Sequence, residues 1–108
     1  MLKIKMEISK NRLTLTANGH AGYAPAGCDI VCAAASMLVR TLMLSLYAQL
    51  SNESDIYFDD PGNGPLTIDA GPCDGDMEGA KMIFRTIACG LEALACQHPD
   101  NVSFTMIE

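Results

Sequence analysis

Three stretches of this sequence alternate between apolar and polar residues, a pattern typical of strands with one face in a core and the other in water. They cover residues 2–8, 12–18 and 101–107. The first two are separated only by the polar run at 9–11, which predicts a hairpin turn. The chain therefore begins with two antiparallel strands and ends with a third strand.

Two shorter strands are predicted in the middle of the chain, at 55–60 and 66–70. Between them lies Asp60-Pro61-Gly62-Asn63-Gly64-Pro65, whose proline, glycine and asparagine residues are those that turns favour. This pair therefore predicts a second hairpin.

Residues 30–50 are apolar on nearly every side and contain no glycine or proline, which predicts a long helix. At 1.5 Å per residue this helix is about 30 Å long, the length of a membrane span. Arg40 at its centre and the lack of flanking basic residues speak against a membrane location. We expect the helix to pack on the sheet on one side and on another helix or a second subunit on the other. Asp29 is the predicted N-cap, which puts Cys32 in the first turn.

A second helix is predicted over residues 77–97, with apolar residues along one face and charged residues along the other. Asp74 or Asp76 is the expected cap at its start. His98 and Pro99 end it, and we interpret His98 as a helix-end residue without a catalytic role.

The element order is ββαββαβ, which predicts an α+β two-layer sandwich in a single domain over residues 1–108. The sheet should have five mostly antiparallel strands, with both helices on one face. The pattern does not determine the order of the strands in the sheet.

The chain is acidic, with a net charge of −6 and a pI of about 4.7. It has no lysine and arginine cluster and no tryptophan, so direct binding to nucleic acid is disfavoured and a basic peptide is a better partner. The N-terminus lacks the apolar core of a secretory signal. The five cysteines are an odd number without zinc-ribbon spacing, which favours free thiols in a reducing cytoplasm.

Candidate chemistry lies between the second strand and the first long helix. A cysteine in the first turn of a helix is stabilised as a thiolate by the free N–H groups and the helix dipole, and a nearby histidine can take its proton. His20 and Cys32 fit these roles, and N–H groups of the first turn could form an oxyanion hole. If the strand kept its register, however, His20 would point away from the core side. The loop at 21–28 contains Gly22, Pro25 and Gly27 and could open and close over a peptide.

Structural interpretations of the same residues remain open at this point. Cys32 could be a small core residue, His20 a polar loop residue, Asp29 only a cap and Ser36 only a residue on the helix face. A metal site of His20, Cys28, Asp29 and Cys32 would lack the spacing of known zinc motifs, so we expect no metal and no other cofactor.

The other cysteines allow a further hypothesis and an expectation. A disulfide between Cys28 and Cys32 would make the site sensitive to oxidation. For Cys73, Cys89 and Cys96 we expect structural roles.

Gly19-His20-Ala21, followed by Gly27 and by the run Asp29-Ile30-Val31-Cys32-Ala33-Ala34-Ala35-Ser36, resembles the signature of the ribosomal-processing cysteine proteases of the Prp (YsxB-like) family. Cys28 departs from the family's loop pattern. The resemblance implies a catalytic dyad of His20 as general base and acid and Cys32 as nucleophile. It places supporting residues at Gly19, Asp29 and Ser36.

The resemblance also implies a function. It is that of a bacterial cytoplasmic homodimer that removes the N-terminal extension of large-subunit ribosomal protein twenty-seven, cutting after an aromatic residue. The basic substrate of the family suits an acidic enzyme. The alternative is a non-enzymatic, ribosome-associated binding protein whose cysteines are structural.

Overall fold

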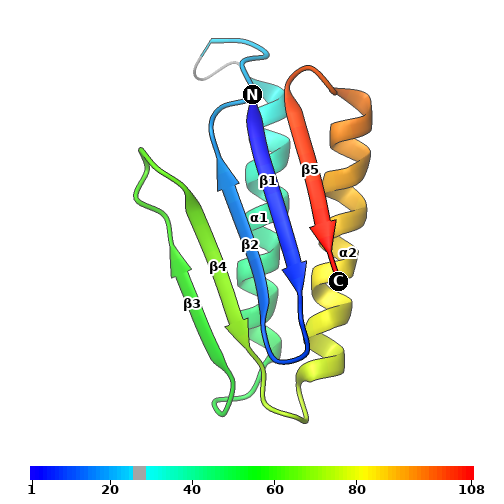
Figure 1. The fold of residues 1–108 in the computed structure, drawn as a ribbon. Helices are drawn as coiled ribbons and strands as arrows, with labels where there is room; N and C mark the ends of the chain where they lie inside the picture. The colour runs from blue at the N-terminus through cyan, green and yellow to red at the C-terminus, as the bar shows by residue number, and fades with distance from the viewer. Residues whose placement is uncertain (26–28) are drawn as a thin grey trace.

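The computed structural model describes residues 1–25 and 29–108. Within them the chain forms five strands and two helices in the predicted order ββαββαβ (Figure 1). The elements are β1 (Leu2–Ile8), β2 (Leu13–Asn18), α1 (Ile30–Gln49), β3 (Asp55–Asp59), β4 (Leu66–Gly71), α2 (Met77–Gln97) and β5 (Val102–Ile107). These bounds lie within a residue or so of the predicted ones, and the predicted α+β class is confirmed.

The five strands form one sheet in the order β3-β4-β2-β1-β5. The two hairpins β1/β2 and β3/β4 are antiparallel, as predicted, and β2 also pairs with β4 antiparallel. The last strand runs parallel to the first, with Leu2 opposite Val102. The first and last strands of the chain therefore lie side by side, with β5 at the edge of the sheet (Figure 1).

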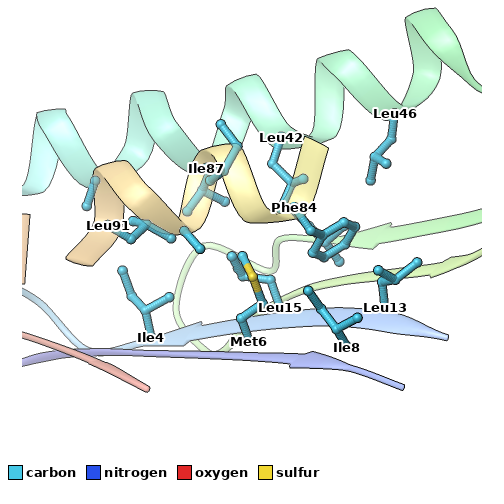
Figure 2. Close-up of a cluster of buried hydrophobic side chains, with 14 of the residues drawn as sticks. Ile4, Met6, Ile8, Leu13, Leu15, Leu42, Leu46, Phe84, Ile87 and Leu91 are labelled. Carbon is cyan, nitrogen blue, oxygen red and sulfur yellow. The ribbon is translucent and has the colours of Figure 1, made fainter. Parts of the chain in front are cut away.

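Both helices cover the same face of the sheet, and the core lies between the two layers (Figure 2). Alternate residues of β1 and β2 point into it, because successive strand residues face opposite sides. Phe84 of α2 and Leu42 of α1 are fully buried against them. Burying one side chain of this size stabilises the fold by about 1.5–3 kcal/mol. The labelled side chains of this layer are Ile4, Met6, Ile8, Leu13, Leu15, Leu42, Leu46, Phe84, Ile87 and Leu91.

The two helices approach each other closely at Gly90, where a Cβ atom would lie only 2.8 Å from Cδ2 of Leu38. Helix α1 thus packs on the sheet and on α2, as predicted. Its outer face carries exposed apolar side chains, with Ile30, Met37 and Leu44 each at least 60% exposed and seven residues apart. By length and composition alone α1 could cross a membrane, a test that core helices of soluble proteins also pass.

The start of α2 differs from the prediction that Asp74 or Asp76 caps it. Asp76 occupies the N-cap position, but its side chain makes no cap hydrogen bond. Its Oδ2 instead accepts hydrogen bonds from the hydroxyls of Ser54 (2.6 Å) and Ser51 (2.9 Å) and from the Ser51 N–H (2.8 Å). The Ser54 hydroxyl first, and then the Ser51 groups, lower the pKa of Asp76 to about 2. Ser54 in turn accepts from the N–H of Cys73, 2.9 Å away. We call these four residues the Asp76 cluster.

Candidate active site

The loop that leaves β2 turns sharply at Gly19. Its φ of +91° is in the region that side chains rarely adopt, and a Cβ atom there would collide with the carbonyl oxygen of Met1. Strand β2 ends at Asn18. Its alternation therefore does not extend to His20 and does not determine which way that side chain points. His20 is exposed and instead lines a cavity that it shares with Cys32.

The first turn of α1 is capped as predicted. Oδ1 of Asp29 accepts the N–H of Cys32 at 2.9 Å, and Oδ2 accepts the N–H of Tyr23 at 3.1 Å. The Cys32 N–H first, together with the Tyr23 N–H, lowers the pKa of Asp29 below its ordinary value. One ionised carboxylate therefore holds both the start of the helix and the loop that precedes it.

Cys32 is half-buried in the third position of α1. The backbone N–H of Ala21 donates a hydrogen bond to its Sγ, with 3.2 Å between the two atoms. Ala21 itself is only 2% exposed. The sulfur thus has an N–H donor beside it and lies in the first turn of a helix. Reactive cysteines are often found at such positions.

Two N–H groups of the first turn are not free for the expected oxyanion hole in this conformation. The Cys32 N–H donates to the carboxylate of Asp29, and the Ala33 N–H donates to the Asp29 carbonyl oxygen at 3.1 Å. Both donors are thus already occupied by the cap. The donor directed at the sulfur comes from Ala21 in the loop, which sequence reasoning did not identify.

A cavity of about 490 Å³ lies between α1, the sheet and the β3–β4 turn. Cys32, Ser36 and Arg40 line it from one face of α1, as their spacing of four residues predicts. Asp60 lies in the lining from the β3–β4 turn, so the cavity has both a cationic and an anionic group. The remaining lining is largely apolar or glycine and comes from Leu2, Ile4, Ala17, Asn18, Gly19, His20, Ala35, Val39, Phe58, Gly62, Asn63, Gly64 and Leu66.

The predicted site residues therefore come together only in part. One cavity is bordered by Gly19, His20, Cys32 and Ser36. Asp29 is not in its lining but accepts the N–H of Cys32 as the helix cap. Among residues 1–25 and 29–108, no hydrogen bond joins His20 to Cys32. Of the predicted flexible loop, Gly22 has a φ of +66°, while Gly27 lies outside the described residues.

The turn between α2 and β5 contacts the site loop at two points that sequence reasoning missed. Nδ2 of Asn101 donates to the carbonyl oxygen of Ala21 at 2.9 Å. The rings of Tyr23 and His98 meet edge to face, with 5.4 Å between their centroids. His98 does end α2 as predicted. About 80 residues separate the partners in sequence, and no local pattern signals such a contact.

The structure describes three of the four remaining cysteines, Cys73, Cys89 and Cys96. Cys28, needed for the disulfide and the metal site, lies outside the described residues, and the described part of the chain has no group of three or more metal-ligating side chains. Cys73 belongs to the Asp76 cluster, which fits a structural role. Cys89 and Cys96 are exposed on α2, so they do not contribute to the core.

The sequence model of the family described as cysteine protease Prp matches residues 1–103 of this chain. The chain belongs to the Prp family of cysteine proteases. The family match covers both strands of the first hairpin, the site loop, both helices and the turn that carries Asn101. No curated protein is similar enough in sequence to count as a relative.

Solved structures share the fold along the whole chain. One is the essential ribosomal processing protease Prp from S. aureus in complex with a covalently linked product peptide, with a TM-score of 0.77 and 22% identity over 98% of this chain and 99% of that one. Another is SMU.848 from Streptococcus mutans, with a TM-score of 0.74 and 24% identity over 99% and 94% of the two chains. At these identities the likeness establishes a common fold.

Proposed function

We propose that this Prp-family protein is an endopeptidase that uses His20 and Cys32 as its catalytic dyad. The observation that supports this most directly is the sulfur of Cys32, which accepts the Ala21 N–H at the start of a helix and borders the same cavity as His20. A sulfur with an N–H donor and a helix N-terminus beside it has the surroundings of a reactive thiolate. A cysteine that only filled the core would be fully buried, whereas Cys32 is half-exposed to the cavity.

The proposed reaction follows from these roles. His20 takes the proton of the Cys32 thiol, and the thiolate attacks the carbonyl carbon of the scissile bond. The C–N bond breaks, the new amine leaves with the proton from His20, and a thioester remains on Cys32. Water, deprotonated by His20, then adds to the thioester, releases the acid product and restores the thiol. His20 and Cys32 must approach each other for the first step, so we expect the substrate to bring the site loop closer to α1.

The supporting residues have separate tasks in this proposal. Gly19 allows the turn that presents His20, and Asp29 holds the loop to the helix that carries Cys32. Ser36, one turn beyond the nucleophile, borders the cavity where the peptide would lie. None of these roles requires a metal or another cofactor.

We propose the N-terminal extension of large-subunit ribosomal protein twenty-seven as the substrate, cut after an aromatic residue. The apolar lining next to Cys32, which includes Phe58, Val39 and Leu66, suits an aromatic side chain. The net charge of −6 favours a basic protein as partner. A protease that processes a ribosomal protein would act in the cytoplasm, without direct contact with nucleic acid or membrane.

We also propose that the enzyme is a homodimer through the outer face of α1. Support comes from the apolar stripe Ile30, Met37 and Leu44, which repeats every seven residues and is exposed in the single chain. Sedimentation of Met37→Glu and Leu44→Glu variants tests this, because a charge in the stripe should give a monomer. A dimer that persists in both variants would contradict the proposal.

The dyad is tested with a synthetic peptide that spans an aromatic–alanine junction and carries basic residues after it. Wild-type protein should cleave it once, whereas Cys32→Ala and His20→Ala should lose at least about a hundredfold in kcat/KM. Ser45→Ala on the same helix, outside the cavity lining, is the matched control and should cleave normally. Circular dichroism checks that each variant is folded.

Cleavage that continues in Cys32→Ala would contradict the proposed nucleophile. That result would favour the alternative function, an acidic protein that binds a ribosomal protein without cutting it. The length of the peptide after incubation also distinguishes the two functions, since a protein that only binds the peptide would leave it uncut.

A further inference from the structure

The turn of residues 98–101, between α2 and β5, reaches the loop that surrounds the sulfur of Cys32. Within this turn, Asn101 is the residue whose side chain touches that loop through a hydrogen bond. The acceptor is the carbonyl oxygen of Ala21, which cannot donate, so the amide of Asn101 must present its NH₂ group there. The N–H of the same alanine donates to Sγ of Cys32. Asn101, Ala21 and Cys32 thus form a continuous chain of two hydrogen bonds.

We infer that Asn101 is a positioning residue for the reactive thiol, which it serves by fixing Ala21 so that the Ala21 N–H stays directed at Sγ of Cys32. This inference rests on the proposed role of Cys32 as nucleophile. Ala21 is bound on both sides, since its N–H and its carbonyl oxygen each have a partner outside the loop. Because Ala21 directly follows His20, the same contact also fixes one end of the histidine's backbone.

Asn101 is held firmly enough for this task. Its backbone N–H donates to the carbonyl oxygen of His98 at 3.0 Å, and its own carbonyl oxygen accepts the N–H of Leu2 at 2.9 Å. The side chain therefore projects from a position fixed by both β1 and the end of α2. In the part of the loop that the structure describes, residues 21–25, further contacts are the Asp29 hydrogen bond to Tyr23 and the ring contact between Tyr23 and His98.

The geometry separates this role from a purely structural one. A residue that only stabilised the fold would affect unfolding, whereas loss of the Asn101 contact should weaken the hydrogen bond to Sγ of Cys32. A typical hydrogen bond changes an equilibrium by about fivefold. The expected effect is thus on the reactivity of one thiol.

The test compares Asn101→Asp and Asn101→Ala with wild type in the rate at which iodoacetamide alkylates Cys32, followed by peptide mapping. Asn101→Asp keeps the size of the side chain but removes the N–H donor. The informative quantity is the alkylation rate at pH 7 divided by the rate at pH 10, a pH well above the ordinary pKa of a cysteine thiol, about 8.5. This ratio cancels changes in access. Asn11→Asp, in the β1–β2 turn at the other end of the sheet, is the control for the added charge.

We expect the ratio to fall about fivefold in both Asn101 variants and to stay unchanged in Asn11→Asp. Peptide cleavage should lose kcat by a similar factor, with KM unchanged. An unchanged ratio in a folded Asn101 variant would overturn the inference, even if Cys32→Ala had proved inactive. If instead Cys32→Ala cleaves the peptide, the proposed function fails while the ratio still reports the influence of Asn101 on the thiol.

If both Asn101 variants fail to fold, the inference can be tested on the wild-type protein. Hydrogen exchange by NMR should show the side-chain amide protons of Asn101 protected relative to those of Asn11. The backbone amide proton of Ala21 should shift when Cys32 alone is alkylated. Exchange of the Asn101 amide as fast as that of Asn11 would refute the inference.

Discussion

The helices α1 and α2 both begin with an aspartate, and the two carboxylates are used in different ways. Asp29 caps α1 at the end of the molecule that contains the cavity, whereas Asp76 lies at the opposite end, where α2 begins (Figure 1). Asp29 accepts hydrogen bonds from two backbone N–H groups, those of Cys32 and Tyr23. The Asp76 carboxylate accepts from the hydroxyls of Ser51 and Ser54 and from the Ser51 N–H, and it makes no cap hydrogen bond to its own helix.

The difference shows that an aspartate at a helix N-cap can serve either the proposed active site, as Asp29 does, or the stability of the fold, as Asp76 does. The partners of Asp29 are the backbone of Cys32, the proposed nucleophile, and the loop that follows His20. The partners of Asp76 join the end of α1 and the start of β3 to α2. We therefore expect changes at Asp29 to affect activity most and changes at Asp76 to affect stability most.

Among the changes at these two aspartates, the largest effect on activity from a conservative substitution is expected from Asp29→Asn. Asparagine is as good an N-cap as aspartate, so its oxygen can still accept the Cys32 N–H. Its NH₂ group cannot accept the Tyr23 N–H, and the negative charge is lost. The site loop should shift, and kcat/KM for the peptide should fall by about tenfold or more, because small displacements of catalytic groups are costly. The melting temperature should change little.

Asp29→Ala is the companion variant, because it removes the cap as well as the loop contact. It should lose both activity and thermal stability. Full activity in Asp29→Asn would mean that the loop is held in place without this carboxylate.

The second effect is expected from Asp76→Asn. An asparagine at this position replaces a charged acceptor with a neutral one, so the bonds from Ser51 and Ser54 become weaker. The melting temperature should drop by several degrees, while kcat/KM stays within about twofold of wild type because the cluster is remote from the cavity. A loss of activity at a temperature where the variant is fully folded would contradict the view that Asp76 affects stability and not activity.

The smallest effect concerns the dependence of stability on pH. The pKa of Asp76 is about 2 in the folded protein, below the ordinary value of 3.8, so the unfolded chain binds the proton first as the pH falls. Its contribution to stability is therefore complete above about pH 5 and is lost progressively as the pH falls towards 2. The difference in melting temperature between wild type and Asp76→Asn should be larger at pH 6 than at pH 3. A constant difference would show that the charge of Asp76 is not what stabilises this end.

Much of the fold could be predicted because each element has a local signal. The alternation at residues 2–8, the cap at Asp29 and the break at His98 and Pro99 all depend on near neighbours. The parallel pairing of β1 with β5 could not be predicted, because it depends on how α2 returns the chain to the sheet. The same limit applies to Asn101, whose partner Ala21 is far away in sequence.

The site was predictable to a similar extent. His20 and Cys32 were identified by chemistry and by the resemblance to the Prp family, but the turn at Gly19 that directs His20 to the cavity was not. Nor could the sequence reveal that the N–H groups of Cys32 and Ala33 are already used by Asp29. These features depend on backbone dihedrals and on competition for donors, which residue types do not specify.

The parallel contact between β1 and β5 also has a consequence for biosynthesis. During synthesis β1 can pair with β2 early, but its contacts with Val102 and Asn101 can form only once that part of the chain has been made. Until then the loop around Cys32 lacks the support of Asn101. A nascent chain without β5 would thus carry its thiol in an unfinished site.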